Sequence, residues 1–145
     1  INIMRLITTV NGYPERQEID SIWSGYDEPL RLDDEAPRSK AASSLQIEAD
    51  ALPDAFQPHL ETTRLILLHL PVFTDGRPYS LAAMLRQHYR YGGEIRIFGD
   101  VRAAQLDHLH RCGINSFVLK EDQDAASALD QIGYFSKWYQ PNISA

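Results

Sequence analysis

The strongest chemical signal in the sequence is a polar loop that contains Asp75, Gly76 and Arg77 and is followed by Ser80. Glycine lets a turn adopt positive φ, and a serine that begins a helix leaves free backbone N–H groups, which attract anions. The Arg77 guanidinium offers paired donors for a carboxylate, a phosphate or a sulfur oxyanion. A purely structural interpretation stays open, in which Asp75 closes a turn, Ser80 caps the helix and Arg77 pairs with a carboxylate.

Charged side chains also follow two further predicted strands. Asp100 and Arg102 come after a strand that ends at Phe98, and Lys120 comes after a strand that ends at Leu119. The carboxyl ends of parallel strands meet at one edge of a sheet, where ligands bind in α/β folds. The predicted ligand-binding edge therefore contains Asp75, Arg77, Ser80, Asp100, Arg102 and Lys120.

Arg96 is an unusual residue for its position in the sequence. It lies inside the predicted strand of residues 94–98, where a central parallel strand normally carries apolar side chains. We therefore count it among the candidate ligand-binding residues, either in contact with a buried carboxylate such as Asp100 or lining a pocket. The alternative is an edge strand with one solvent-exposed face.

The cysteine and the histidines do not form a predicted site. The chain has one cysteine, Cys112, which excludes an intrachain disulfide and a Cys-x-x-Cys pair. Cys112 lies on the apolar side of a predicted helix near its carboxyl end, so we expect a small packed side chain rather than a redox group. His108 and His110 are two residues apart on this helix and point in different directions. His69 lies within an aliphatic strand, and no metal site is predicted.

The common cofactor and nucleophile motifs are absent from the sequence. It contains no G-x-G-x-x-G, no G-x-x-x-x-G-K-[ST] and no G-x-S-x-G. A Rossmann dinucleotide site, a P-loop and a hydrolase nucleophile elbow are therefore unexpected, and the residues assign no cofactor.

Strand and helix patterns alternate from residue 45 to residue 132. The run from Arg64 to Leu70 is typical of a strand buried on both faces. A helical stripe from Leu81 to Tyr89 predicts a helix that Ser80 caps. About four successive strand–helix units predict an α/β domain over residues 45–145 with a parallel sheet, either an open doubly wound sheet or a half-barrel.

Residues 1–44 are predicted to form a small N-terminal β arm and a linker. Strand-like residues at 3–9 are followed by a turn signal at Asn11-Gly12. Weaker strand signals lie around residues 19–23 and 30–32, and residues 33–44 have the composition of a loop.

Length and charge exclude several classes of protein. The chain has 145 residues, 43% of them hydrophobic and 23% charged, which is typical of one globular domain. Its net charge of −6 argues against general nucleic-acid binding, which needs a basic face. The longest apolar run, residues 65–68, is far shorter than the ~20 residues of a membrane span. Because no signal-peptide pattern is found, we expect a cytoplasmic protein.

An ordered set of segments between residues 65 and 120 resembles a bacterial family known as domain of unknown function 934. The segments are F-T-D-G-R-P-Y-S at 73–80, G-E-I-R at 93–96, G-D-V at 99–101 and R-C-G at 111–113. Members are often labelled oxidoreductases of sulfite reduction, and their genes commonly neighbour those of assimilatory sulfite reductase. The resemblance therefore implies a part in sulfate assimilation, without supplying a catalytic residue or cofactor. The family's D-Q pair is Ala104-Gln105 in this chain, so that acid is missing.

Three functions remain open from the sequence. The first is an accessory protein of sulfite reduction, which binds a small anion or a partner such as sulfite reductase at the arginine-rich edge. The second is an oxidoreductase that binds a flavin or NADPH without a glycine-rich fingerprint. The third is a non-catalytic half-barrel module that acts by assembly, for which we expect a homodimer because open sheet edges need cover.

Overall fold

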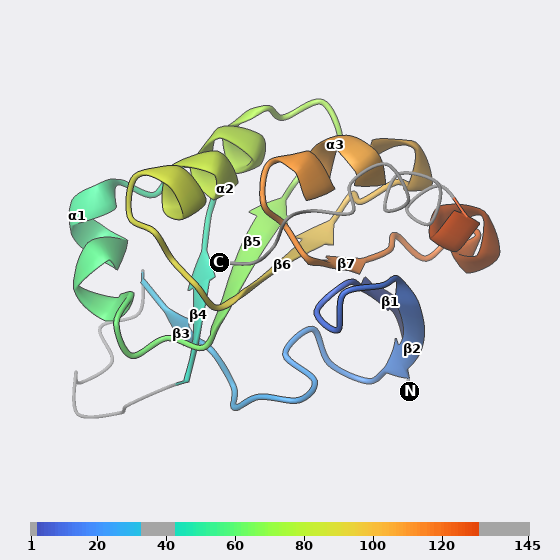
Figure 1. Ribbon diagram of the computed structural model, residues 1–145, viewed down its shortest axis with the longest axis horizontal. Coiled ribbons are helices and arrows are strands. Elements are labelled where there is room, and N and C mark those ends of the chain that lie inside the picture. Colours follow the sequence, from blue (N-terminus) through green and yellow to red (C-terminus); the bar gives the residue numbers. More distant parts are fainter. Residues whose placement is uncertain (1–2, 33–42, 131–145) are drawn as a thin grey trace.

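The computed structural model describes residues 3–32 and 43–130, which form one seven-stranded sheet beneath a layer of helices (Figure 1). The strand order is β2-β1-β7-β6-β5-β4-β3. Strands β3 to β7 run parallel to one another, whereas β1 is antiparallel to both β2 and β7. This arrangement confirms the predicted α/β class and the mostly parallel sheet. The strands are β1 (Met4–Thr8), β2 (Glu15–Ile19), β3 (Leu30–Arg31), β4 (Ser44–Ile47), β5 (Leu65–Leu70), β6 (Glu94–Gly99) and β7 (Ser116–Val118).

The helices that connect β4 to β7 lie on one face of the sheet (Figure 1). The parallel strands are neighbours in chain order, so each right-handed crossover returns its helix to the same side. A doubly wound sheet requires a reversal of strand order, and the described strands contain none. That alternative is therefore wrong, and the half-barrel stays a prediction. The labelled helical elements are α1 (Pro53–Phe56), η1 (Gln57–His59), α2 (Arg77–Gln87), η2 (Ala103–Gln105) and α3 (Leu106–Arg111), and residues 125–130 are also helical.

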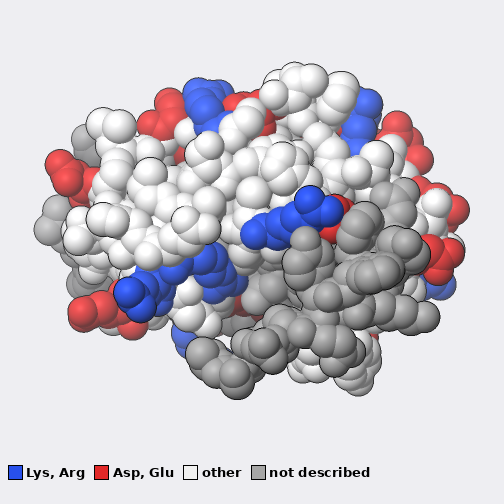
Figure 2. Space-filling model, turned by 45° about the horizontal axis from the view of Figure 1, so that its top comes forward, with Lys and Arg blue, Asp and Glu red and all other residues white. Residues whose placement is uncertain are grey.

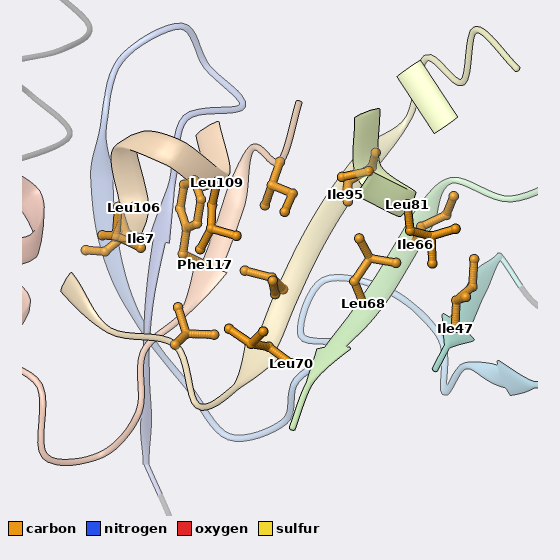
Figure 3. Packing of buried hydrophobic residues seen from close by; sticks show 14 of the residues in the cluster. Ile7, Ile47, Ile66, Leu68, Leu70, Leu81, Ile95, Leu106, Leu109 and Phe117 are labelled. Atoms are coloured by element: carbon orange, nitrogen blue, oxygen red, sulfur yellow. The ribbon is translucent and has the colours of Figure 1, made fainter. Parts of the chain in front are cut away.

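The main core lies between the helices and the sheet. Alternate residues of each strand point toward the helices, as the two-residue period of a strand requires. Each fully buried aliphatic side chain of this kind contributes about 1.5–3 kcal/mol of transfer free energy. Figure 3 shows this packing, which includes Ile7, Ile47, Ile66, Leu68, Leu70, Leu81, Ile95, Leu106, Leu109 and Phe117.

The opposite face of the sheet carries more polar side chains. Leu6, Ile19 and Val118 form a small apolar cluster on this face. The segment between β2 and β3 crosses this face beside the apolar cluster. Arg96 of β6 holds the segment there by donating hydrogen bonds to the backbone carbonyls of Ile22 and Ser24. The chain thus covers part of the face that the helices leave open.

Helix α2 begins earlier than the sequence predicts. Gly76 is its N-cap and Arg77 its first residue, so Ser80 is inside the helix and the predicted serine cap is wrong. Pro78 fits the first turn, where its missing N–H has no intrahelical partner to lose. The helix ends at Gln87, and Arg90 then adopts a positive φ of 55°.

Residues 3–32 supply three strands of the sheet, with β1 and β2 at one edge and β3 at the other. Strand β2 covers residues 15–19 rather than 19–23, and Gly12 in the preceding turn has φ +92°. Because β1 pairs with β7 as well as with β2, the hairpin extends the parallel part of the sheet. Residues 33–42 of the predicted linker lie outside the described residues, and the division at residue 44 stays a prediction.

In the described parts of the chain, no helix has the length and apolar character needed to cross a membrane.

Candidate functional site

The loops after β5 and β6 hold Phe73 at the carboxyl edge of the sheet. The backbone N–H of Phe73 donates to the Asp100 carboxylate at 2.9 Å, and the Gln105 side-chain amide donates to the Phe73 carbonyl at 2.6 Å. The guanidinium carbon of Arg102 lies 3.8 Å from the centre of the Phe73 ring. Three contacts from one neighbouring loop thus fix the position of this aromatic residue.

The charged residues of the predicted edge are paired with one another. Arg77 binds Asp75 at 2.8 Å, and Arg102 binds Asp100 at 3.0 Å. The Lys120 ammonium lies 3.9 Å from Asp100. The structure therefore brings Asp100, Arg102 and Lys120 together, while Asp75 and Arg77 form a separate pair at the start of α2.

These ion pairs limit what the edge can bind. Hydrogen bonds from Arg77 lower the pKa of the Asp75 carboxyl below its usual value. The hydrogen bond from Arg102 is the main reason that the pKa of Asp100 is also lowered. A small oxyanion would have to displace a carboxylate from its arginine before it could use either guanidinium fork.

Arg96 is not part of this edge. It alternates with Ile95 and Ile97, whose side chains point toward the helices, so its own side chain points to the opposite face. There it pairs with Glu94 at 2.7 Å, with only 4% of its side chain exposed. The predicted contact with Asp100 is therefore wrong, and the carboxylate that Arg96 meets precedes it by two residues in the same strand.

The carboxyl edge also exposes large apolar side chains. Leu52 follows β4, and Val72 and Phe73 follow β5; they are 72%, 52% and 38% exposed. The two loops are close enough for the charge of Asp50 to raise the pKa of Arg77, although the hydrogen bond and charge of Asp75 have larger effects. Exposed apolar residues and paired charges thus share one surface.

A shallow groove of about 540 Å³ adjoins Phe73 between α2 and α3. Burial raises the pKa of the Cys112 thiol in its wall, which makes the thiolate less available. On the helical side, Figure 2 shows a largely uncharged surface with basic side chains in separate groups. The groove is lined by Phe73, Thr74, Gly76, Tyr79, Ser80, Ala83, His108 and Cys112.

A second polar pair was not expected from the sequence. His69 in β5 and Glu48 just after β4 lie on the face away from the helices, with Nδ1 and Oε1 2.7 Å apart. The Gln46 amide donates to the other Glu48 oxygen at 3.1 Å. Burial alone would raise the pKa of Glu48, but the hydrogen bonds from His69 and Gln46 and the charge of Arg31 outweigh it and lower the pKa.

The sequence indicates the orientation of Glu48 but not its partner. Gln46 and Glu48 are the polar members of an apolar–polar alternation, which places both side chains on one face of a strand. Within residues 3–32 and 43–130, no group of three or more His, Cys, Asp or Glu side chains is arranged to hold a metal ion.

Comparison with known proteins gives a family but no described relative. The model of a family described as "Bacterial protein of unknown function (DUF934)" matches residues 44–145. Searches of the curated proteins and of the solved structures gave no significant match.

Proposed function

Since the chain belongs to the bacterial DUF934 family, we propose that it is an accessory protein of sulfite reduction, which docks on a partner enzyme through its carboxyl edge. The context of sulfite reduction comes from the gene neighbourhood that the family resemblance implies. The surface that we propose for docking consists of the exposed side chains of Leu52, Val72 and Phe73 with the flanking pairs Asp75–Arg77 and Asp100–Arg102.

The observation that supports this proposal is the exposure of Leu52, Val72 and Phe73 at one edge. Protein interfaces typically have an apolar centre that is enriched in aromatic residues and surrounded by a polar rim. Asp100 and Gln105 hold the Phe73 backbone, and the Arg102 guanidinium lies against its ring, so part of the freedom that a partner would restrict is already lost.

The same geometry favours a protein partner over a small anion. Both edge arginines have a carboxylate partner, so an oxyanion gains only the difference between two ion pairs. A protein partner can keep these pairs at the rim and take its binding energy from Val72 and Phe73. The charged pairs would then mainly affect the association rate and its dependence on salt.

The test compares two pairs of exposed apolar residues. Val72 and Phe73 lie at the carboxyl edge, whereas Val10 and Tyr13, which are 50% and 60% exposed, lie in the turn between β1 and β2 at the other edge. We expect the Val72→Ala/Phe73→Ala variant to lose about tenfold or more in affinity for sulfite reductase of the same organism. The measurement is biolayer interferometry with the purified enzyme.

The matched control is the Val10→Ala/Tyr13→Ala variant, for which we expect wild-type affinity. Circular dichroism melts of both variants check that folding is intact. Absence of binding by the wild-type chain, or an equal loss in the two variants, would show that the edge does not dock this enzyme.

A further inference from the structure

We propose that a cavity at the carboxyl ends of β6 and β7 binds a small zwitterion with a planar apolar part, such as an aromatic α-amino acid. The cavity has a volume of about 620 Å³, within the size range of small-molecule sites. It lies on the face of the sheet away from the helices and shares no residue with the proposed docking surface. The proposal therefore does not depend on the proposed function.

The first argument is an apolar floor with one free aromatic face. Met4, Ile22 and Phe98 line the cavity and pack against the small cluster that includes Val118. One face of the Phe98 ring stacks on the His69 imidazole, with a centroid distance of 4.9 Å and an interplanar angle of 12°. Because Phe98 also lines the cavity, its opposite face is available to a planar ring in an offset stack.

This aromatic surface is held in place before any ligand binds. Nδ1 of His69 lies 2.7 Å from one Glu48 oxygen, and the Gln46 amide donates to the other oxygen of that carboxylate at 3.1 Å. The imidazole on which Phe98 stacks therefore has a fixed orientation. A surface that is already ordered loses less conformational entropy on binding than a mobile one.

The second argument is the arrangement of charged side chains around this floor. Two bases, Arg5 and Lys120, and two acids, Asp20 and Glu121, line the cavity. Among the described residues, no ion pair joins either of these bases to either of these acids. Both signs of charge are therefore available at one cavity, so a ligand that carries both signs fits it better than a simple anion or cation.

Arg5 is the base best placed to bind the carboxylate of such a ligand. Its Nη2 donates to the backbone carbonyl of Glu121, while Nε and Nη1 have no partner among the described residues. Lys120 is less available, because its ammonium lies 3.9 Å from Asp100 and 3.6 Å from Asp122. A guanidinium that is anchored at one nitrogen still has donors for a carboxylate.

Asp20 is the acid best placed to bind the ammonium. It is exposed, it directly follows β2, and no described residue forms an ion pair with its carboxylate. Because Ile19 pairs with Met4 in the β1–β2 register, Asp20 lies at the same end of the hairpin as Arg5. The two charged groups therefore reach the cavity from neighbouring parts of the hairpin, beside the apolar floor.

The location in the sheet agrees with these arguments. The cavity lies where the parallel strands end beside the antiparallel hairpin, because β7 is parallel to β6 and antiparallel to β1. Ligand sites of parallel α/β sheets lie at the carboxyl ends of the strands. Gly99 follows Phe98 in the cavity wall and has φ +113°, a conformation that favours glycine and leaves this part of the wall without a side chain.

The test uses three probes that share a phenyl ring: L-phenylalanine, hydrocinnamate, which lacks the ammonium, and phenethylamine, which lacks the carboxylate. Each is titrated at neutral pH into the full isotope-labelled chain, and amide NMR spectra give the dissociation constant and the residues that respond. We expect saturable shifts at Phe98, Gly99 and Glu121. We expect L-phenylalanine to bind about tenfold more tightly than either partial analogue, because each analogue loses one charged contact.

Two variants separate the charged groups. Arg5→Gln is expected to weaken the binding of L-phenylalanine about tenfold and to leave the affinity for phenethylamine unchanged. Asp20→Asn is expected to weaken L-phenylalanine to a similar extent and to leave the affinity for hydrocinnamate unchanged. The matched controls are Arg16→Gln and Glu28→Gln, which each remove one exposed charge outside the cavity and should keep the wild-type affinities. Circular dichroism melts check that all four variants are folded.

Three results would overturn the proposal. The first is the absence of saturable shifts at the cavity with L-phenylalanine. The second is a partial analogue that binds as tightly as L-phenylalanine, because the cavity would then recognise only one charge or none. The third is an equal effect of Arg5→Gln and Asp20→Asn on all three probes, because the two side chains would then not bind opposite ends of the ligand.

Discussion

The face of the sheet away from the helices carries two acid–base pairs with the same separation of 2.7 Å between nitrogen and oxygen. In the Arg96–Glu94 pair, the two side chains are only 4% and 8% exposed. In the His69–Glu48 pair, they are 32% and 41% exposed. The two pairs therefore have the same separation of charged atoms but differ in their exposure to solvent.

The surroundings of the two pairs explain the difference. Arg96 donates to Glu94 and to the carbonyls of Ile22 and Ser24, and Glu94 also accepts hydrogen bonds from Tyr26 and Ser116. Buried charges that are satisfied on every side hold a fold together and are not available to a ligand. The histidine pair lies nearer the carboxyl edge and keeps one nitrogen unoccupied by any described residue.

The strongest test of this contrast removes the buried arginine. In Arg96→Met, Glu94 stays buried without its cation, and we expect a loss of about 3–5 kcal/mol in the free energy of unfolding. Urea denaturation measures this loss. The double variant Glu94→Gln/Arg96→Met has no uncompensated charge and should recover part of the stability. A single-variant loss below about 1 kcal/mol, the range of surface pairs, would remove the distinction between the two pairs.

A smaller effect is expected from the tyrosine that completes the buried network. The Tyr26 hydroxyl donates to Glu94 at 2.8 Å, so Tyr26→Phe leaves one carboxylate oxygen short of a donor. We expect a loss of about 1–3 kcal/mol in the free energy of unfolding. The control Tyr13→Phe, at a side chain that is 60% exposed, should change stability by no more than about 0.5 kcal/mol.

The same variant has a signature at alkaline pH. Burial, then the hydrogen bond and charge of Glu94, raise the pKa of Tyr26 from 10.0 to about 12. A phenol with a raised pKa stabilises the folded state fully below pH 10.0 and loses that contribution as the pH rises toward about 12. The free energy of unfolding, measured by urea titration at several pH values in this window, should therefore fall more steeply with pH for the wild type than for Tyr26→Phe. Equal slopes would show that the folded structure does not raise the pKa of Tyr26.

The sequence predicts the sheet better than it predicts the partners within it. The aliphatic run at residues 64–70 and the alternation at residues 45–48 locate β5 and β4, because burial on a strand leaves a local pattern. The Arg96–Glu94 pair could also be predicted from the sequence, because residues two apart in a strand share a face. The carboxylate predicted for Arg96 was Asp100, beyond the end of the strand, whereas its partner is Glu94 within the strand.

The His69–Glu48 pair could not be derived in the same way. Its residues are 21 positions apart, and they meet because Ile47 pairs with Leu68 in the β4–β5 register. That register depends on how the apolar residues of both strands pack beneath the helices, which no local pattern states. A histidine in an aliphatic strand therefore gives no sign, in the sequence alone, of the acid beside it.

The smallest expected effect comes from removing the charge of the exposed pair. Glu48→Gln keeps an oxygen that can accept from His69, so we expect a loss of no more than about 1 kcal/mol, as for other solvent-screened pairs. The pKa of Glu48 is lowered from 4.5, so its contribution is present above that pH and is lost as the pH falls through the folded value. Urea denaturation from about pH 6 to about pH 3 should show a shallower acid slope in Glu48→Gln than in the wild type.

The control for this measurement is Glu61→Gln, which changes an exposed acid before β5 and should leave the acid slope at its wild-type value. If Glu48→Gln were as destabilising as Arg96→Met, both pairs would be structural, and exposure would not distinguish them.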